Sequence, residues 1–233
     1  AQEMLDTTLL AYRIAEDRRV FLPIAISADG AFLTHSQTIV QVPTKAKVDR
    51  FLPKYDRGDL QLHPDNPITV APQANEDWVI EIRRQNNEAM NRAYTVIEEA
   101  YADFRKEFGR GPENPWFEEY MTEDADVILM GMGTISLPFK VGIRNMRAQG
   151  KKVGLIRPRW FRPFPTEKMV AALSGAKAIG VIDRDTTLGH ANDDNSKPAA
   201  LTYKTAIEAA LEWSHRERAR GLSGGSEAGP TVS

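Results

Sequence analysis

Cysteine is absent from this chain of 233 residues. Its absence excludes disulfide bonds and any cysteine-ligated iron–sulfur cluster on the chain itself, and it fits a cytoplasmic location. No apolar run reaches the roughly 18 residues of a membrane-spanning helix. The net charge of −2 gives no overall electrostatic reason to expect nucleic acid or an anionic membrane as a partner. The histidines lack metal-ligand spacing, and common nucleophile, P-loop and zinc motifs are missing, so no metal site is predicted.

Residues 127–182 carry a clear α/β pattern. Apolar runs at 127–133, 152–156 and 178–182 alternate with helix-like stretches at 137–149 and 166–173. Apolar runs without polar alternation are typical of parallel strands that are buried on both faces. The sequence therefore predicts a wound βαβαβ unit with a mostly parallel sheet.

The N-terminal part reads as an incomplete α/β piece. A helix is expected at 2–17, followed by candidate strands at 20–26 and 38–42, with Gly30 in a turn suited to positive φ. A long helix is expected from about residue 78 or 82 to 108. The apolar face expected for the first helix consists of Met4, Leu5, Thr8, Leu9, Tyr12 and Ala15.

Two domains are predicted from this division. The first covers residues 1–110, residues 111–122 form a linker, and the second covers 123–218, ending in a helix from about 201. The glycine- and serine-rich tail at 219–233 is expected to be disordered. One or two strands cannot form a stable sheet alone, so the first domain is expected to depend on other polypeptide.

The glycines after the first buried run have two interpretations. Gly131 and Gly133 precede a helix, where backbone amides could bind a phosphate or carboxylate, with Arg157 nearby at the end of the next strand. A plain tight turn is the favoured alternative. A dinucleotide site is less favoured than either, because Ser136 replaces the third glycine of the fingerprint and arginines occupy the position of the ribose-binding carboxylate.

An aromatic and basic string between the second strand and the next helix also has two interpretations. Its arginines could grip an anion, but its aromatic side chains at a strand exit suit a contact with another subunit or domain. The contact is favoured, and its candidate residues are Trp160, Phe161, Arg162 and Phe164.

The turn after the first candidate strand holds Asp29 and His35. A histidine near an aspartate can shuttle protons. No nucleophile pattern lies nearby, so structural hydrogen bonding is the favoured interpretation.

Several segments, in order and spacing, resemble the alpha subunits of the pyruvate:ferredoxin oxidoreductase (pyruvate synthase) family. The resemblance covers about residues 1–215, and the segments that carry it are Gln2–Asp17, Leu22–Gly30, Leu33–His35, Phe51–Tyr55, Asp65–Pro67, Gln85–Met90 and Phe161–Pro165. It implies an enzyme that converts a 2-oxo acid, most simply pyruvate, and coenzyme A to acyl-CoA and carbon dioxide while reducing ferredoxin, or the reverse. It also implies a pyrimidine-side thiamine-diphosphate-binding α/β domain followed by a domain like the C-terminal domain of transketolase.

The same resemblance implies where the cofactors lie. Thiamine diphosphate and Mg²⁺ are expected mainly on a beta subunit, and iron–sulfur clusters on other subunits of the beta, gamma and delta types. The family's N-terminal part, with the activating glutamate, has no counterpart in this sequence, so the chain is expected to be inactive alone. Asp29, Gly30 and His35 are the residues expected closest to the cofactor cleft. A stand-alone module that binds an anion or nucleotide is the alternative function.

Overall fold

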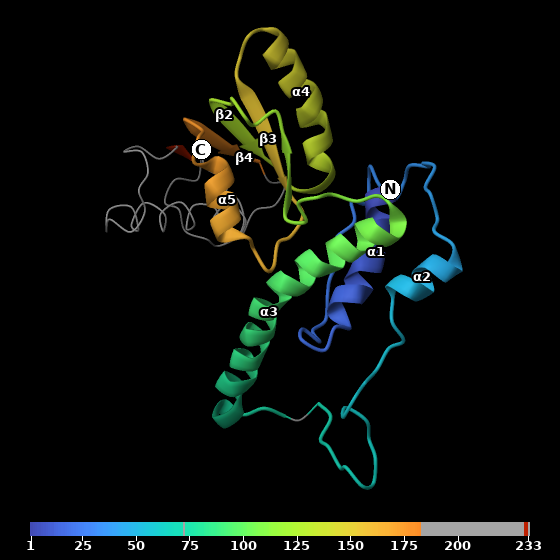
Figure 1. Cartoon of the computed structure of the whole chain (residues 1–233). Coiled ribbons are helices and arrows are strands. Elements are labelled where there is room, and N and C mark those ends of the chain that lie inside the picture. The colour runs from blue at the N-terminus through green and yellow to red at the C-terminus, as the bar shows by residue number, and fades with distance from the viewer. Residues whose placement is uncertain (72, 183–230, 233) are drawn as a thin grey trace. The chain divides into compact units, whose positions relative to one another are not determined.

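The structure is a computed structural model that describes residues 1–71, 73–182 and 231–232 (Figure 1). The chain divides into two compact units, residues 1–115 and 116–233. The helix predicted at 201–218 and most of the predicted tail lie outside the described residues.

The first unit is built on a long helix. Within its described residues it contains three helices, α1 (Gln2–Ala15), α2 (Lys45–Phe51) and α3 (Glu76–Phe108). The prediction of the first and long helices is confirmed, whereas α2 was not predicted. Gly109 ends α3 in the left-handed conformation, with φ of 68°, and its amide donates to the Arg105 carbonyl at 2.9 Å.

The core of the first unit lies along the C-terminal half of α3. Buried α3 residues recur at helical spacing, and α1 and α2 pack against that half. Phe51 of α2 meets Phe104 and Phe108 edge-on, with ring centroids 5.4 Å and 5.3 Å apart. The other buried residues of α3 are Ala89, Ala93, Val96, Ile97, Ala100 and Tyr101.

The buried face of α1 differs from the predicted one. Leu10, Ala11 and Ile14 are buried, whereas the predicted face includes Tyr12, which is 56% exposed. Apolar residues surround most of this helix, so spacing alone does not select a face. The buried face also contains Asp6, whose carboxylate accepts two hydrogen bonds from Arg110, at 3.0 Å and 2.7 Å.

The prediction of two strands in the first unit is wrong. Residues 20–26 and 38–42 form no strand, and among the described residues no backbone–backbone hydrogen bond joins residues 22–26 or 38–42 to another segment. A strand forms only where a neighbouring strand accepts and donates backbone hydrogen bonds along its length. Without such a neighbour the apolar side chains stay open, and Ile39 is fully exposed.

The second unit is a mixed sheet with helices, which confirms the predicted α/β class. Its strand order is β1-β3-β2-β4-β5, with β1 antiparallel to β3 and the other neighbours parallel. The elements of the second unit are β1 (Phe117–Tyr120), β2 (Val127–Met130), η1 (Gly133–Ile135), α4 (Ser136–Ala148), β3 (Val153–Pro158), α5 (Thr166–Leu173), β4 (Ala178–Val181) and β5 (Thr231–Val232). The predicted βαβαβ series is present as β2, α4, β3, α5 and β4.

The topology reverses direction at β2. The chain runs from β2 through α4 to β3 on one side, and then through α5 to β4 on the other side of β2. Right-handed crossovers in opposite directions place α4 and α5 on opposite faces of the sheet, as Figure 1 shows. The carboxyl ends of β2 and β4 therefore flank a switch point, where ligands of open α/β sheets commonly bind.

Two strands lie where no strand was predicted. β1 falls inside residues 111–122, the predicted linker, because Phe117 and Tyr120 suit an edge strand even though two glutamates separate them. β5 corrects the prediction of a disordered tail for residues 231–232, since Thr231 and Val232 are β-branched and pair with β4.

Candidate functional site

The turn at residues 29–36 brings the three predicted cleft residues together. The Asp29 carboxylate accepts hydrogen bonds from the amides of Ala31 and Phe32, at 2.8 Å and 2.7 Å. The Thr34 amide donates to the Asp29 carbonyl at 3.2 Å. These bonds make the turn a locally closed structure, in the manner of an Asx turn.

His35 is bound to the same turn. Its Nδ1 atom contacts the Gly30 carbonyl, and the Thr34 hydroxyl lies 3.2 Å from that nitrogen. Gly30 and His35 are both exposed. The turn therefore presents the imidazole at the surface, with Nδ1 engaged by the backbone.

Gly30 does not have the positive φ that was predicted for it. It is not among the glycines with a left-handed backbone, and a Cβ there would meet no atom within 4 Å. The conformation comes instead from Asp29, which bonds the following amides directly.

The glycines after β2 form a tight turn, the interpretation that the sequence favoured. Gly133 has φ of 69°, and the buried Ser136 hydroxyl donates to its carbonyl at 2.6 Å. A Cβ on Gly131 would lie 2.9 Å from the Phe139 ring, so this glycine permits close packing of α4. These roles are structural, and anion binding at the loop stays a prediction.

Arg157 belongs to a charged cluster under α4. Its Nε donates to Glu118 at 2.8 Å, and Lys140 of α4 binds the other oxygen of the same carboxylate. Burial raises the pKa of Glu118, but the hydrogen bonds from Lys140 and Arg157 outweigh burial, so that the pKa is lowered overall. The cluster joins the edge strand β1 to β3 and α4.

The aromatic string that was predicted as an interface partly packs within its own unit. The Trp160 ring lies 6.4 Å from the Trp116 ring, and the Trp116 carbonyl accepts the Arg159 amide at 2.8 Å. Phe161 is 39% exposed, and the Arg162 guanidinium lies 5.8 Å from its ring centroid. Phe164 is half-buried. An interface at Trp160, Phe161, Arg162 and Phe164 stays a prediction.

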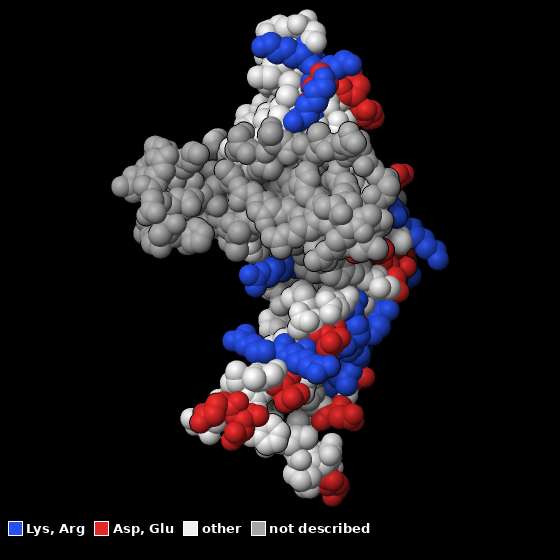
Figure 2. Space-filling model, turned by 90° about the vertical axis from the view of Figure 1, so that its left-hand side faces the viewer, with Lys and Arg blue, Asp and Glu red and all other residues white. Residues whose placement is uncertain are grey.

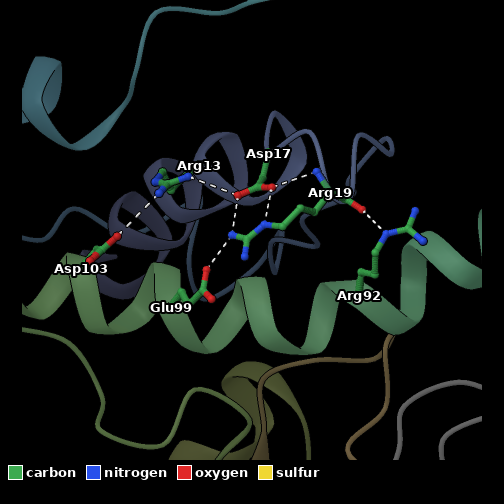
Figure 3. Close-up of polar contacts among 6 residues, drawn as sticks. All are labelled: Arg13, Asp17, Arg19, Arg92, Glu99 and Asp103. Carbon is green, nitrogen blue, oxygen red and sulfur yellow. Dashed lines mark hydrogen bonds and ion pairs between the residues drawn. The ribbon is translucent and has the colours of Figure 1, made fainter.

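An ionic network holds the end of α1 on α3 (Figure 3). The Asp17 carboxylate accepts two bonds from the Arg19 guanidinium, at 2.9 Å and 2.8 Å, and Arg19 also donates to Glu99 at 2.6 Å. The Arg92 side chain donates to the Arg19 carbonyl at 2.7 Å. The network fixes the point from which the chain leaves toward the turn at residues 29–36.

Sequence reasoning missed this network, although one signal for it exists. Arg13 pairs with Asp17 four residues later in sequence and with Asp103 of α3, both at 3.6 Å. Glu99 and Asp103 are also four residues apart, on one side of α3. Such spacing indicates a charged flank on each helix.

Charge on the described surface is mixed. Basic and acidic side chains are interspersed on the face drawn in Figure 2, and exposed ion pairs such as Lys45–Asp49 and Arg50–Glu107 occur at 2.6 Å and 2.7 Å. Within residues 1–71, 73–182 and 231–232, no group of three or more His, Cys, Asp or Glu could hold a metal ion. In the same part of the chain, no helix has the length and apolar character needed to cross a bilayer.

Two family models match the chain in sequence order. The thiamine-diphosphate-binding domain of pyruvate flavodoxin/ferredoxin oxidoreductase matches residues 1–102, and pyruvate:ferredoxin oxidoreductase core domain II matches residues 125–210. The chain belongs to the pyruvate:ferredoxin oxidoreductase family. The predicted resemblance is thereby confirmed.

Two named relatives match most of the chain. The chain is 39% identical over 186 residues to pyruvate synthase subunit PorA of Methanothermobacter thermautotrophicus, covering 80% of this chain and 48% of that subunit. It is 37% identical over 190 residues to the alpha subunit of NADH-dependent phenylglyoxylate dehydrogenase of Aromatoleum evansii, covering 78% of this chain and 45% of that subunit. The chain thus spans about half the length of these relatives.

One solved structure matches part of the chain. It is the 2-oxoglutarate:ferredoxin oxidoreductase from Magnetococcus marinus with 2-oxoglutarate, coenzyme A and succinyl-CoA bound. The TM-score is 0.36 at 15% identity, over 73% of this chain and 24% of that one. A likeness at this level identifies neither a substrate nor a partner of this chain.

Proposed function

We propose that this chain is part of the alpha subunit of a thiamine-dependent 2-oxoacid:ferredoxin oxidoreductase whose substrate is pyruvate. One observation carries the proposal: 39% identity to a pyruvate synthase subunit across 80% of the chain, over both matched domains. The complex would convert pyruvate and coenzyme A to acetyl-CoA and carbon dioxide, with electrons passing to ferredoxin, or run in reverse.

In this proposal the chain supplies scaffold to the cofactor cleft. When bound, thiamine diphosphate supplies the carbon nucleophile that attacks the 2-oxo acid. On the family resemblance, Mg²⁺ and the diphosphate are assigned mainly to the beta subunit. On the same resemblance, iron–sulfur clusters are assigned to other subunits, and this sequence has no cysteine to ligate one. The turn with Asp29, Gly30 and His35 would form part of the cleft wall, because its internal hydrogen bonds make it rigid and its imidazole is exposed.

Purification of the native complex through a tag on this chain tests the proposal. The expected result is reduction of ferredoxin or a viologen dye that requires pyruvate, coenzyme A and thiamine diphosphate together. 2-Oxoglutarate and phenylglyoxylate are the comparison substrates. Faster turnover with either one would overturn the assignment of pyruvate, and no turnover with any 2-oxo acid would overturn the proposed function.

His35→Glu tests whether the turn borders the cleft. A new negative charge there is expected to lower kcat about tenfold, since small displacements around a reacting centre reduce rates strongly. His63→Glu is the control, because His63 also has an exposed side chain in an irregular segment. Equal kcat for His35→Glu and the wild-type complex would refute a place for the turn at the cleft.

The alternative of a stand-alone anion- or nucleotide-binding module is not favoured. The relatives are named as subunits, and Arg157 is already bound to Glu118. The alternative predicts that phosphate or a nucleotide raises the melting temperature of the chain alone.

A further inference from the structure

The first half of α3 carries an apolar stripe that the described residues leave uncovered. Trp78, Val79 and Ile82 are 65%, 42% and 38% exposed. Steps of three or four residues from Trp78 and Ile82 lead to Ala89, Ala93 and Val96, which are buried. The exposed stripe is therefore the direct continuation of the face that α1 covers farther along the helix.

The cover over α3 ends at a definable point. Arg92 of α3 binds the carbonyl of Arg19, just beyond the end of α1. From Glu76 to Glu88 every residue of α3 is exposed. Figure 1 shows this half of the helix extending past α1. The uncovered half thus begins where the intramolecular packing partner stops.

The charges beside the stripe indicate what kind of partner fits it. Along the covered half, Glu99 and Asp103 lie on one flank and bind arginines from the α1 segment. Glu81 and Glu88 lie on the same flank, since steps of seven and eleven residues lead from Glu81 through Glu88 to Glu99. No ion pair joins Glu81 or Glu88 to another described residue. The uncovered half therefore repeats the combination that binds α1, an apolar stripe with an acidic flank.

We propose that residues 76–88 of α3 are a docking surface for an amphipathic helix of a partner subunit. That helix would place apolar residues on Trp78, Val79 and Ile82 and Lys or Arg beside Glu81 and Glu88. In an antiparallel pair with a second copy of α3, equal flanks would meet, so Glu81 and Glu88 would face acids. The inference rests on the proposed function only in taking the chain as a subunit.

A pair of equivalent substitutions tests the surface in the native complex. Ile82→Glu is expected to reduce recovery of partner subunits with the tagged chain about tenfold or more, because a charge at a buried contact centre is strongly unfavourable. Ile80→Glu is the control, since Ile80 is 72% exposed and lies off the stripe; recovery is expected to stay within about twofold of wild type. Glutamate is a good helix former, so circular dichroism should show equal helix content.

A photo-reactive residue at position 82 identifies the occupant in the purified complex. A cross-linked peptide from another subunit, with helically spaced apolar residues and Lys or Arg beside them, supports the proposal. A cross-link to this same chain, or none, overturns it, as do equal effects of the two substitutions. If no other subunit co-purifies with the wild-type chain, the proposed function fails as well. If subunits co-purify and Ile82→Glu loses none, only the docking surface is refuted.

Discussion

Asp17 lies just beyond the end of α1 and pairs with two arginines. Its carboxylate is 11% exposed and contacts both Arg13 and Arg19. The hydrogen bond from the Arg19 side chain lowers the pKa of Asp17, and a hydrogen bond from Arg19 likewise lowers the pKa of Glu99. The ionised carboxylates therefore stabilise the folded chain.

Asp17→Asn is expected to reduce the free energy of unfolding by about 1 kcal/mol at pH 7, since Arg19 is half-exposed and solvent screens the pair. A lowered folded-state pKa means that the stabilisation is complete above the unfolded pKa, about 3.9, and disappears as pH falls through the folded value. The difference from wild type should be constant from pH 7 to 5 and shrink below about pH 4. Urea unfolding at several pH values measures it.

Asp103→Asn is the matched control. Asp103 is 55% exposed and lies 3.6 Å from the Arg13 guanidinium, so the expected cost is below about 0.5 kcal/mol. Equal costs for the two substitutions would contradict the role of Asp17.

At the scale of elements, β3 lies against backbone at one glycine. A Cβ on Gly154 would lie 2.5 Å from the Met121 carbonyl oxygen and 3.0 Å from the Thr122 Cα. The same carbonyl accepts a hydrogen bond from Arg147 of α4 at 2.7 Å, so it is held from two sides. Close packing of β3 therefore requires a residue without a side chain.

Gly154→Ala is expected to destabilise the chain by about 3 kcal/mol, because backbone rather than a flexible side chain would have to move. Gly142→Ala in α4 is the control; no atom lies within 4 Å of its added Cβ, and alanine favours a helix by about 0.5–1 kcal/mol. Thermal unfolding should thus show a lower midpoint for the first and an equal or higher one for the second. A midpoint for Gly154→Ala at or above wild type would contradict this packing.

Sequence patterns predicted elements well where their determinants are local. The runs at β2 and β4 are apolar throughout, β3 is apolar up to Arg157, and α3 shows periodic burial, so their type and position could be predicted. The strand predicted at 20–26 is absent, because a strand depends on hydrogen-bonded neighbours that a sequence pattern does not reveal. β1 was missed because Glu118 sits mid-strand, and only its distant partners Lys140 and Arg157 make that position suitable.

The candidate site was predictable to a smaller extent. Asp29, Gly30 and His35 could be grouped because they are close in sequence, and they do share one turn. The engagement of Arg157 by Glu118 could not be foreseen, since the antiparallel pairing of β1 with β3 brings them together.

At the scale of the whole molecule, most of the exposed large apolar side chains among the described residues belong to the first unit. Val42, Trp78 and Ile80 are each at least 65% exposed, and Ile39 is fully exposed. Large apolar surface on one part of a protein commonly marks contact with another protein. The first unit is thus expected to be the less stable unit when the chain is isolated.

The melting temperature of the chain is expected to rise when partner subunits are co-expressed, because a ligand that binds only the folded state stabilises it. Phosphate and nucleotides are expected to leave it unchanged. Differential scanning fluorimetry of the chain alone, with each small molecule, and in the complex makes the comparison. A rise with nucleotide and none with partner subunits would favour the stand-alone module.

The length of α3 has a consequence for the time course of assembly. Its 33 residues form a rod of about 50 Å that is anchored over only its second half. Backbone amides of residues 80–88 should exchange with deuterium much sooner than those of residues 93–108, because unanchored helix opens locally. Slower exchange of the amides of residues 80–88 would then report the time at which the partner helix binds, before any catalytic activity appears.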